Sequence, residues 1–558
     1  MSPTGLSAPH DFDWIVVGSG FGGSTSALRL AEKGYSVGVL ESGSRYEDHE
    51  FAKSTWDLRR YFYLPRFGLR GIFRLSLFKH LSVVSGSGVG GGSLGYANTL
   101  YVPPKAFFED PRWAGCSEDW EAELSEHFAE AERMLGVVEY DQEDPAGQVL
   151  KAFGEHLGVA ETYGQARVGV FFGAAGKTVP DPYFGGEGPA RTGCIRCGRC
   201  MVGCPIGAKN TLRKNYLWFA EKLGVKVMAE RDVTDIRPIG ALDGSEGYQI
   251  TTERSGAWLR KRRRTFTARG VVVAAGALGT NKLLQNCRLV GGLPDISPRL
   301  GELVRTNSES ILTVTLPEGR IGDQTQRVAI TGSMYPDAHT HIETVSYGHD
   351  GDSMSMLYTV LVGDGTRVTR PLKWLAALMR HPVRAVRMLD PRGWSRNTII
   401  LLVMQTLDNA IALRPVRTRS GRIRLQTEQD PSRPNPTFIP VANQAAEWIA
   451  ERYGGVAGSS IMEAVANVPT TAHILGGAVI ADSPAGGVVD HRQRVFGYEN
   501  LLVCDGSVIP ANIGVNPSLT ITALAERAIS LIPPAPERAI AAPTVDAGAR
   551  RAPDRAPS

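Results

Sequence analysis

The feature that most restricts the fold of this 558-residue chain is the stretch DFDWIVVGSGFGGSTSALRLAEKGYSVGVLESG at residues 11–43. An apolar run ends in Gly18-x-Gly20-x-x-Gly23, a helical pattern follows, and a second apolar run ends at Glu41. This order predicts a βαβ unit that binds a dinucleotide: Gly18 makes the tight turn, Gly20 admits a pyrophosphate, and Gly23 lets helix and strand pack closely. Glu41 suits a ribose hydroxyl, because a carboxylate accepts that hydrogen bond. The competing interpretation is a glycine-rich structural turn.

A second glycine cluster reads GSGVGGGSL at residues 86–94. It predicts many backbone N–H groups close to something planar or anionic, although its composition is also typical of a flexible loop. Further on, residues 225–236 and 270–284 have the apolar pattern of late strands in a doubly wound sheet. The nucleotide-binding part of the chain is therefore expected to return after a long insertion.

The composition excludes some classes of protein. The formal net charge is +4 at pH 7, which is too mild to predict nucleic-acid binding. The first residues, MSPTGLSAPHDFDW, lack the apolar segment of a secretory signal, and no run approaches the roughly 18 apolar residues of a membrane span. We therefore expect a cytoplasmic protein with reduced thiols, in which clustered cysteines bind metal or do redox chemistry.

Three motifs near the carboxyl terminus carry a family resemblance: HILGG at residues 473–477, DGSVIP at 505–510 and GVNPS at 514–518. Together with VVGSGFGGS and GVGGGSL, they resemble the glucose–methanol–choline (GMC) flavoprotein oxidoreductases, and within them the bacterial cholesterol oxidases, over about residues 12–532. The resemblance implies non-covalently bound FAD. It also implies an α/β fold, in which a Rossmann-like FAD-binding domain carries an inserted substrate domain built on an antiparallel sheet.

The implied domains are discontinuous in sequence. The FAD-binding domain takes residues 12–105, 215–305 and 468–532, and the substrate-binding domain takes residues 106–214 and 306–467. Residues 533–558 are rich in proline and alanine with mixed charge, so they are predicted to form a disordered tail.

Matching the family motifs residue by residue gives candidate site residues. His473 corresponds to the active-site histidine, and Asn516 to the asparagine beside the flavin. Glu343, in THIETVSYG, corresponds to the carboxylate that moves a ring proton during sterol isomerisation. Where the family has asparagine just after GGS, this chain reads GGSLGYANTL, and Asn98 is the displaced substitute. The predicted FAD-binding set is Gly18, Gly20, Phe21, Gly22, Gly23, Glu41, Gly88, Gly90, Gly91, Gly92, Ser93, Asn98, Val233, Gly276, Asp505, Gly506 and Asn516.

Oxidising an alcohol requires an acceptor for the hydroxyl proton while the hydride passes to flavin N5. His473 can be that acceptor, because an imidazole titrates near working pH; the alternative is a core histidine with both nitrogens satisfied. Asn516 precedes Pro517 and an apolar-periodic segment, so its structural alternative is the N-cap of a helix, which is compatible with a place beside the flavin. The amino terminus of such a helix would stabilise the anionic reduced flavin. The alternative for Glu343 is a strand carboxylate that faces solvent.

Four cysteines form a compact run: Cys194, Cys197, Cys200 and Cys204, the last followed by proline. This spacing reproduces the C-x₂-C-x₂-C-x₃-C-P run of bacterial ferredoxins and predicts a [4Fe–4S] cluster, with Cys204, Cys116 or Cys287 as the fourth ligand. Zinc and a metal-free loop are the alternatives. A cluster hands electrons on singly, so it would serve a dehydrogenase that feeds a protein or other one-electron acceptor.

Two stretches interleave aromatic and basic residues, at 56–82 and 367–396. They suit a surface that meets anionic lipid or covers an apolar pocket, whereas amphipathic helices with apolar stripes in the core are the favoured interpretation. The resemblance implies FAD-dependent oxidation of an apolar alcohol, a 3β-hydroxysterol, with Δ5 to Δ4 isomerisation, and the composition favours a place in the cytoplasm or peripherally at the membrane. One alternative is a dehydrogenase of another bulky secondary alcohol with an iron–sulfur relay. The other is a catalytically silent flavin-binding redox partner.

Overall fold

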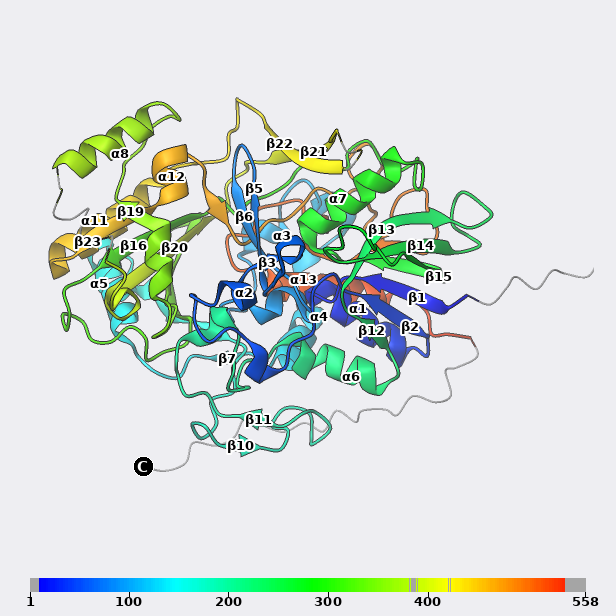
Figure 1. The fold of residues 1–558 in the computed structure, drawn as a ribbon, viewed down its shortest axis with the longest axis horizontal. Coiled ribbons are helices and arrows are strands. Elements are labelled where there is room, and N and C mark those ends of the chain that lie inside the picture. The colour runs from blue at the N-terminus through cyan, green and yellow to red at the C-terminus, as the bar shows by residue number, and fades with distance from the viewer. Residues whose placement is uncertain are drawn as a thin grey trace, which may run out of the picture.

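The computed structural model describes residues 10–536, apart from residues 381, 383–387, 389, 420 and 422. Two seven-stranded sheets dominate the fold and lie at opposite ends of the molecule (Figure 1). Most of the tail predicted for residues 533–558 lies outside the described residues. None of the helices in the described part of the chain is both long and apolar enough to cross a bilayer.

The first sheet begins with the predicted βαβ unit. Strand β1 (Phe12–Val17) leads into helix α1 (Phe21–Glu32) and strand β2 (Val37–Leu40), and β1 and β2 pair in parallel. The strand order is β12-β2-β1-β15-β14-β13, with β25 also paired to β15. The later strands are β12 (Lys226–Met228), β13 (Arg231–Pro238), β14 (Tyr248–Arg254), β15 (Arg264–Val273) and β25 (Leu501–Val503). The central strands read IVV, VGVL and GVVV because parallel strands are covered on both faces.

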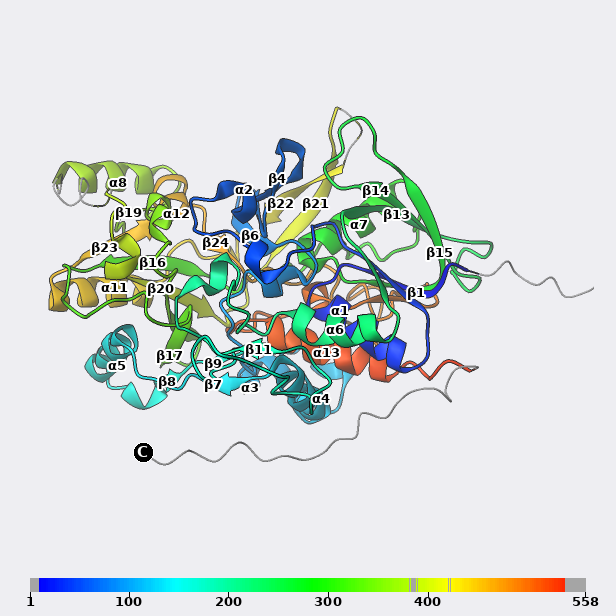
Figure 2. The ribbon, with the colours of Figure 1, turned by 60° about the horizontal axis from the view of Figure 1, so that its bottom comes forward.

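Helices cover this sheet and bring distant segments together. Helix α1 packs against α13 (Ser518–Ser530) and α6 (Tyr216–Lys222), and α13 packs against α4 (Trp120–Leu135) (Figure 2). Helix α7 (Gly276–Leu289) follows β15 and contacts β13. The sheet is thus built from residues 12–40, 226–273 and 501–503, which is the return after an insertion that the sequence predicted.

The second sheet is antiparallel, with the order β19-β23-β16-β20-β18-β17-β8. On its central strand β20 (Thr398–Gln405), the side chains of Ile399, Leu401 and Val403 join the core under helices α5 (Pro145–Leu157) and α11 (Pro440–Tyr453). The alternate residues face the cysteine loop. The other strands are β8 (Gly164–Gln165), β16 (Ser310–Thr315), β17 (Ile330–Asp337), β18 (Thr340–Val345), β19 (Tyr358–Val360) and β23 (Val456–Ser460). The predicted fold class, a Rossmann-like part with an antiparallel substrate sheet, is confirmed.

The favoured interpretation of residues 56–82 as an amphipathic helix was wrong. This stretch forms only a one-turn helix α2 (Leu58–Tyr61), followed by two small hairpins: β3 (Tyr63–Leu64) with β4 (Leu69–Arg70), and β5 (Phe73–Leu77) with β6 (Ser82–Gly86). Strand β24 (Thr470–Thr471) adds to β6 in parallel. The alternation in FRLSL has a period of two, which is a strand pattern rather than a helical one.

Residues 369–380 do form a helix, α8 (Thr369–Arg380), but its apolar stripe is not in the core. Leu372 is 62% exposed and Met379 is 70% exposed. Helix α8 stands at the edge of the molecule, above the second sheet (Figure 1). In each of the stretches 56–82 and 367–396, some apolar side chains therefore lie on the surface. The sequence pattern could not distinguish these side chains from buried ones.

Candidate active site

The amino terminus of α1 forms an open cradle. Gly18 has a left-handed φ of +103°, and a Cβ added to Gly23 would lie 2.1 Å from the Gly18 carbonyl oxygen, so both glycines have the predicted roles of turn and close packing. A Cβ added to Gly20 would meet no atom of the described residues within 4 Å. Gly20 also caps α1 without any side-chain hydrogen bond, so the N–H groups of the first turn point toward this open space.

Glu41 joins the two glycine loops to the sheet. Its buried carboxylate accepts from the Ser19 N–H at 3.1 Å and the Ser19 hydroxyl at 2.7 Å, and its other oxygen accepts from the Gly43 N–H at 2.7 Å. A Cβ added to Gly91 would lie 2.5 Å from the Cα of Gly20, so the loop at 88–94 lies directly against the first glycine loop. That loop contains Gly88 and Gly90 in the left-handed region, then Gly91, Gly92 and Ser93 in a 3₁₀ turn.

Asp505 organises the third segment of the cradle. Its carboxylate accepts at 2.9 Å from the N–H of Gly276, the first residue of α7. It also accepts at 2.8 Å from the N–H of Ser507, in the turn that contains Gly506. A Cβ added to Gly22 would lie 1.7 Å from the Cys504 carbonyl oxygen, so α1 approaches this turn as closely as its backbone allows. Asp505 therefore binds protein groups with both oxygens and positions the cradle.

Val233 and Phe21 lie at two edges of the same region. The backbone N–H of Arg231 donates to the Glu41 carbonyl at 2.8 Å, so the chain that leads to Val233 on β13 runs past the end of β2. Phe21 is the first residue of α1, and its ring packs edge-on against Tyr96 at a centroid distance of 5.5 Å. The structure thus brings both glycine loops, the turn at Asp505 and the start of β13 to the end of the first sheet at which β1 and β2 finish.

Asn98 supports the fit of a flavin to this cradle. The residue is fully buried in a left-handed conformation with a φ of +73°, and within the described part of the chain neither its side-chain oxygen nor its nitrogen has a hydrogen-bond partner. Buried amides without partners are rare, and they indicate a missing polar group. The side-chain oxygen of Asn516 is also buried, with no partner in the residues that the structure describes. With the uncapped helix and the space at Gly20, these groups suit a ligand with an anionic pyrophosphate and a polar ring edge.

The three predicted catalytic residues lie together. Asn516 Nδ2 donates to Glu343 Oε2 at 3.3 Å and lies 3.4 Å from His473 Nε2. His473 follows strand β24, Glu343 is the fourth residue of β18, and Asn516 precedes α13. Glu343 is fully buried, so the alternative of a solvent-facing strand carboxylate was wrong. Its cross-strand neighbours are Ser333 and Leu402, on the sheet face that is turned away from α5 and α11.

The alternative of an N-cap role for Asn516 was also wrong. Helix α13 begins at Ser518, Pro517 holds the N-cap position, and among the described residues no side chain caps the helix. The amide of Asn516 is directed to Glu343 and His473 instead. The helix amino terminus beside it still carries the partial positive charge that the sequence predicted.

Glu309 is a site residue that the sequence analysis missed. One of its carboxylate oxygens contacts Nδ1 of His473, and the other accepts the Ala472 N–H at 2.9 Å. The side chain of Glu309 is fully buried, whereas that of His473 is 12% exposed. Glu309 lies in the segment TNSES, which matches no catalytic motif, so only the fold reveals it.

The electrostatics of the site follow from burial and these two carboxylates. Burial lowers the pKa of His473, but the neighbouring charges of Glu309 and then Glu343 more than offset it, so the pKa is raised. Burial raises the pKa of Glu343 to about 8, although His473 and Asn516 act in the opposite direction. At neutral pH the site therefore favours a protonated Glu343 beside a basic imidazole.

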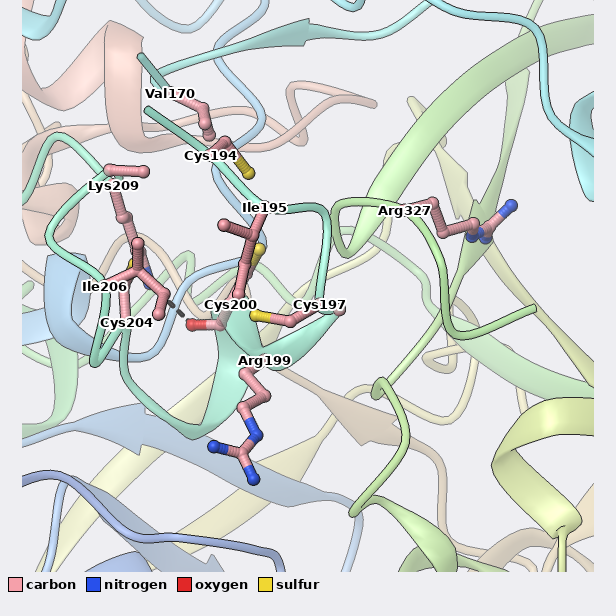
Figure 3. Close-up of a pocket in the computed structure, with 12 residues that line it drawn as sticks. Val170, Cys194, Ile195, Cys197, Arg199, Cys200, Cys204, Ile206, Lys209 and Arg327 are labelled. Atoms are coloured by element: carbon pink, nitrogen blue, oxygen red, sulfur yellow. Dashed lines mark hydrogen bonds between the residues drawn. The ribbon is translucent and has the colours of Figure 1, made fainter. Parts of the chain in front are cut away.

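The four cysteines of the run line one small cavity (Figure 3). They lie on a loop shaped by Gly198, whose left-handed φ of +67° allows its backbone to touch that of Gly348. Burial raises the pKa of the Cys194 thiol to about 12 and that of Cys200 to about 11, so both are neutral thiols at physiological pH. Of the other candidate ligands, Cys116 lines a different cavity and Cys287 is buried in the core of the first sheet. Cys204 is thus the fourth cysteine at this cavity.

Lys209 connects the cysteine cavity to the second glycine loop. Its buried amine donates to the carbonyls of Cys200 at 2.9 Å, Leu94 at 3.0 Å and Tyr96 at 2.8 Å. Burial lowers its pKa to about 7, although the thiols of Cys200 and Cys204 raise it. Arg199 and Arg327, which also line the cavity, pair with Asp350 and Asp144. In Figure 3, Lys209 lies beside Cys200, whereas Arg327 points away from the cysteines.

In the described residues, no three histidine, cysteine, aspartate or glutamate side chains are arranged to hold a metal ion. The four thiols thus share a cavity without forming a coordination sphere in this structure. The [4Fe–4S] cluster, zinc and the metal-free loop stay alternatives for this run.

Comparisons with known proteins agree with this architecture. Family models described as GMC oxidoreductase match residues 190–300 and 426–525. A cholesterol oxidase of Mycobacterium tuberculosis is 49% identical over 534 residues, which cover 94% of this chain and 91% of the relative. A cholesterol oxidase of Acinetobacter baumannii is 47% identical, with 94% and 95% covered. The solved formate oxidase of Aspergillus oryzae RIB40 superposes with a TM-score of 0.62 at 13% identity, with 94% and 98% covered.

Fold, cradle and relatives together define an FAD-dependent oxidoreductase that acts on CH–OH groups. The chain belongs to the GMC oxidoreductase family. The alternative of a catalytically silent flavin-binding partner is therefore set aside.

Proposed function

We propose that the protein oxidises the 3β-hydroxyl of a sterol and then isomerises the product from the Δ5 to the Δ4 ketone. The observation that carries the proposal is the contact of Asn516 with both His473 and Glu343, which places a basic imidazole and a buried carboxylate at one amide. Relatives that are named cholesterol oxidases, at 47–49% identity over most of the chain, support the substrate class.

In the proposed oxidation, His473 Nε2 accepts the hydroxyl proton as the C–H bond breaks and the C=O bond forms. Bound FAD supplies the acceptor for the hydride. The raised pKa of His473 makes the imidazole a stronger base for this proton, and the carboxylate of Glu309 balances the positive charge that results. Asn516 orients the hydroxyl through its amide, whose buried oxygen has no hydrogen-bond partner among the described residues.

In the proposed isomerisation, Glu343 takes a proton from the ring carbon between the ketone and the double bond, and returns it at the far end of the shifted double bond. The group must be ionised to take the proton, and burial has already raised its pKa to about 8. A buried carboxylate of this pKa is a stronger base than an exposed one, so its desolvation favours the transfer.

The test of the proposed function is a panel of alcohols mixed anaerobically with the FAD-loaded protein. A 3β-hydroxysterol should bleach the flavin absorbance at least tenfold faster, at equal concentration, than its 3α epimer or a primary alkanol. Equal rates for the three would leave alcohol oxidation standing and remove the sterol assignment.

A second candidate function is electron export through the cysteine run. Lys209 bridges the cysteine cavity and the loop at 88–96, which lies against the cradle, so this one side chain connects the cysteine run with the wall of the candidate FAD site. Among the described residues, Lys209 has no carboxylate partner, and an anionic thiolate cluster would supply the missing negative charge. Thiols bind metal only as thiolates, so loading would release protons from Cys194 and Cys200. Analysis of iron and sulfide in anaerobically purified protein tests this candidate.

We also propose peripheral membrane contact through the exposed apolar side chains of α8 and of the two hairpins at 63–86. Leu372 and Met379 on α8, and Phe67 and Leu77 on the hairpins, are all at least half exposed. Arg367, just before α8, donates to the carbonyl of Lys79, so the two regions touch. Figure 2 shows α8, α2 and β4 along one side of the molecule. Co-sedimentation with anionic vesicles should decrease in a Leu372→Ser, Met379→Ser variant, and unchanged sedimentation would contradict this surface.

A further inference from the structure

A short turn before β16 places Glu309 against His473. Asn307 and Ser308, the two residues before Glu309, both have left-handed backbone conformations, with φ of +58° and +49°. Such conformations cost free energy in residues other than glycine, and they persist only when the surrounding structure holds them. The strain is therefore a sign that the position of Glu309 is specified.

Hydrogen bonds of Asn307 hold this turn to the segment that carries Asn516. The Asn307 N–H donates to Asn512 Oδ1 at 2.9 Å, and its side-chain amide donates to the Val515 carbonyl at 3.0 Å. Its side-chain oxygen accepts from the Gly514 N–H at 2.8 Å. One buried network thus fixes Glu309 at Nδ1 of His473 and Asn516 at Nε2 of the same ring.

We propose that Glu309 is a positioning residue that keeps the proton of neutral His473 on Nδ1, so that Nε2 faces the substrate as the acceptor. This inference rests on the proposed role of His473 in alcohol oxidation. An ionised carboxylate only accepts hydrogen bonds, so the ring nitrogen in contact with Glu309 must be the donor. The second oxygen of Glu309 accepts the Ala472 N–H, which fixes the carboxylate in this orientation.

The charges that face His473 set the pH dependence of this arrangement. They come from Glu309 in the turn before β16 and from Glu343 on β18, while Asn516 before α13 is neutral. Because the neutral imidazole accepts the proton, the rate should rise with pH through the pKa of His473. Removing the Glu309 charge lowers that pKa, so the rise should move to lower pH while the maximum rate falls.

The first test uses the FAD-loaded Glu309→Gln variant and any alcohol that reduces the wild-type flavin. The maximum rate of anaerobic flavin reduction should fall by roughly 10², the usual worth of a positioned acid or base. The half-saturating alcohol concentration should change less than about threefold, because Glu309 acts through His473. A wild-type rate with an unshifted pH profile would overturn the proposal.

A second readout does not depend on turnover. Diethyl pyrocarbonate modifies neutral imidazole, so the pH dependence of His473 modification, followed by peptide mass spectrometry, reports the pKa of His473. The midpoint should lie at lower pH in Glu309→Gln than in wild type, and an equal midpoint would contradict the proposal. If no alcohol reduces the wild-type flavin, the proposed function fails while this measurement still tests Glu309.

Glu463→Gln is the matched control. Glu463 lies on α12 (Ile461–Ala466) and is as buried as Glu309. Its carboxylate accepts at 3.2 Å from the hydroxyl of Ser310, the residue that follows Glu309 in the sequence. This variant should keep the wild-type rate and pH profile.

If Glu309→Gln does not fold, Glu309→Asp retains the charge and should keep the midpoint of modification near the wild-type pH. A midpoint in Glu309→Asp at clearly lower pH would overturn the proposal.

Discussion

The side-chain nitrogen of Asn516 lies 3.4 Å from Nε2 of His473, although the two residues are 43 positions apart. The same nitrogen donates to Glu343, 173 positions away. The end of β24, strand β18 of the second sheet and the start of α13 must therefore all be in place before the site exists. The chemistry depends on how the two sheets meet, and each residue can be tested by itself.

Replacing His473 should remove the proton acceptor and leave the cradle intact. In His473→Ala, anaerobic flavin reduction by alcohol should slow by roughly 10² or more, with normal FAD content. Stopped-flow absorbance measures the rate. His80→Ala is the control, because His80 is hydrogen-bonded to Thr427 away from the cradle, and it should retain the wild-type rate. A His473→Ala variant with the wild-type rate would exclude this residue from the mechanism.

A side chain at Gly20 should prevent FAD binding. No atom in the described part of the chain lies within 4 Å of a Cβ added to Gly20, so Gly20→Val should fold and fill the place of the pyrophosphate. The protein should purify colourless, and absorbance together with thermal unfolding measures this. Gly363→Val also adds a side chain in open space, but on an exposed loop, and should stay yellow. Normal flavin content in Gly20→Val would contradict the cradle.

Glu343 should control isomerisation separately from oxidation. The ionised carboxylate takes the ring proton, and burial raises its pKa to about 8, so isomerisation of an added Δ5-3-ketosteroid should increase as the pH rises through about 8. Glu343→Gln should reduce this rate by roughly 10² or more while flavin reduction continues. The ultraviolet absorbance of the conjugated ketone measures the product. A rate that falls between pH 7 and 9, or an unaffected variant, would remove Glu343 from this role.

The sequence predicted the parts of the site that depend on local pattern. The glycines of the first loop and the order of strand, helix and acidic residue specify the cradle, because their spacing is fixed by backbone geometry. His473, Asn516 and Glu343 came from motif resemblance, and the structure brings them together. The roles of these residues remain predictions until the variants are measured.

Other parts of the molecule could not be predicted, for physical reasons. Glu309 acts on His473 from 164 positions away, and its own segment has no periodicity or motif. The stretches at 56–82 and 367–396 both mix apolar and basic residues. This composition is the same for a segment whose apolar side chains are buried in the core and for one whose apolar side chains lie on the surface. Burial of Leu372 or Leu77 depends on a partner surface, and that surface is a property of the fold.

The last prediction concerns the route by which electrons leave the enzyme. If the cysteine run holds a [4Fe–4S] cluster, anaerobically purified protein should contain about four iron and four sulfide per chain, and Cys197→Ser should remove them. Flavin reduction by alcohol should continue in this variant, because His473, Asn516 and the cradle are unchanged. Turnover with a one-electron acceptor should fall, because electrons would then have to leave the cradle without the relay.

The control for this prediction is Cys116→Ser, because Cys116 lines a separate cavity and should leave iron, sulfide and turnover unchanged. Zinc in place of iron would assign the run to a structural site instead. Unchanged turnover of Cys197→Ser with the one-electron acceptor would show that electrons leave directly from the cradle. The bridge from Lys209 to Tyr96 would then be a structural clamp on the second glycine loop, with no part in electron transfer.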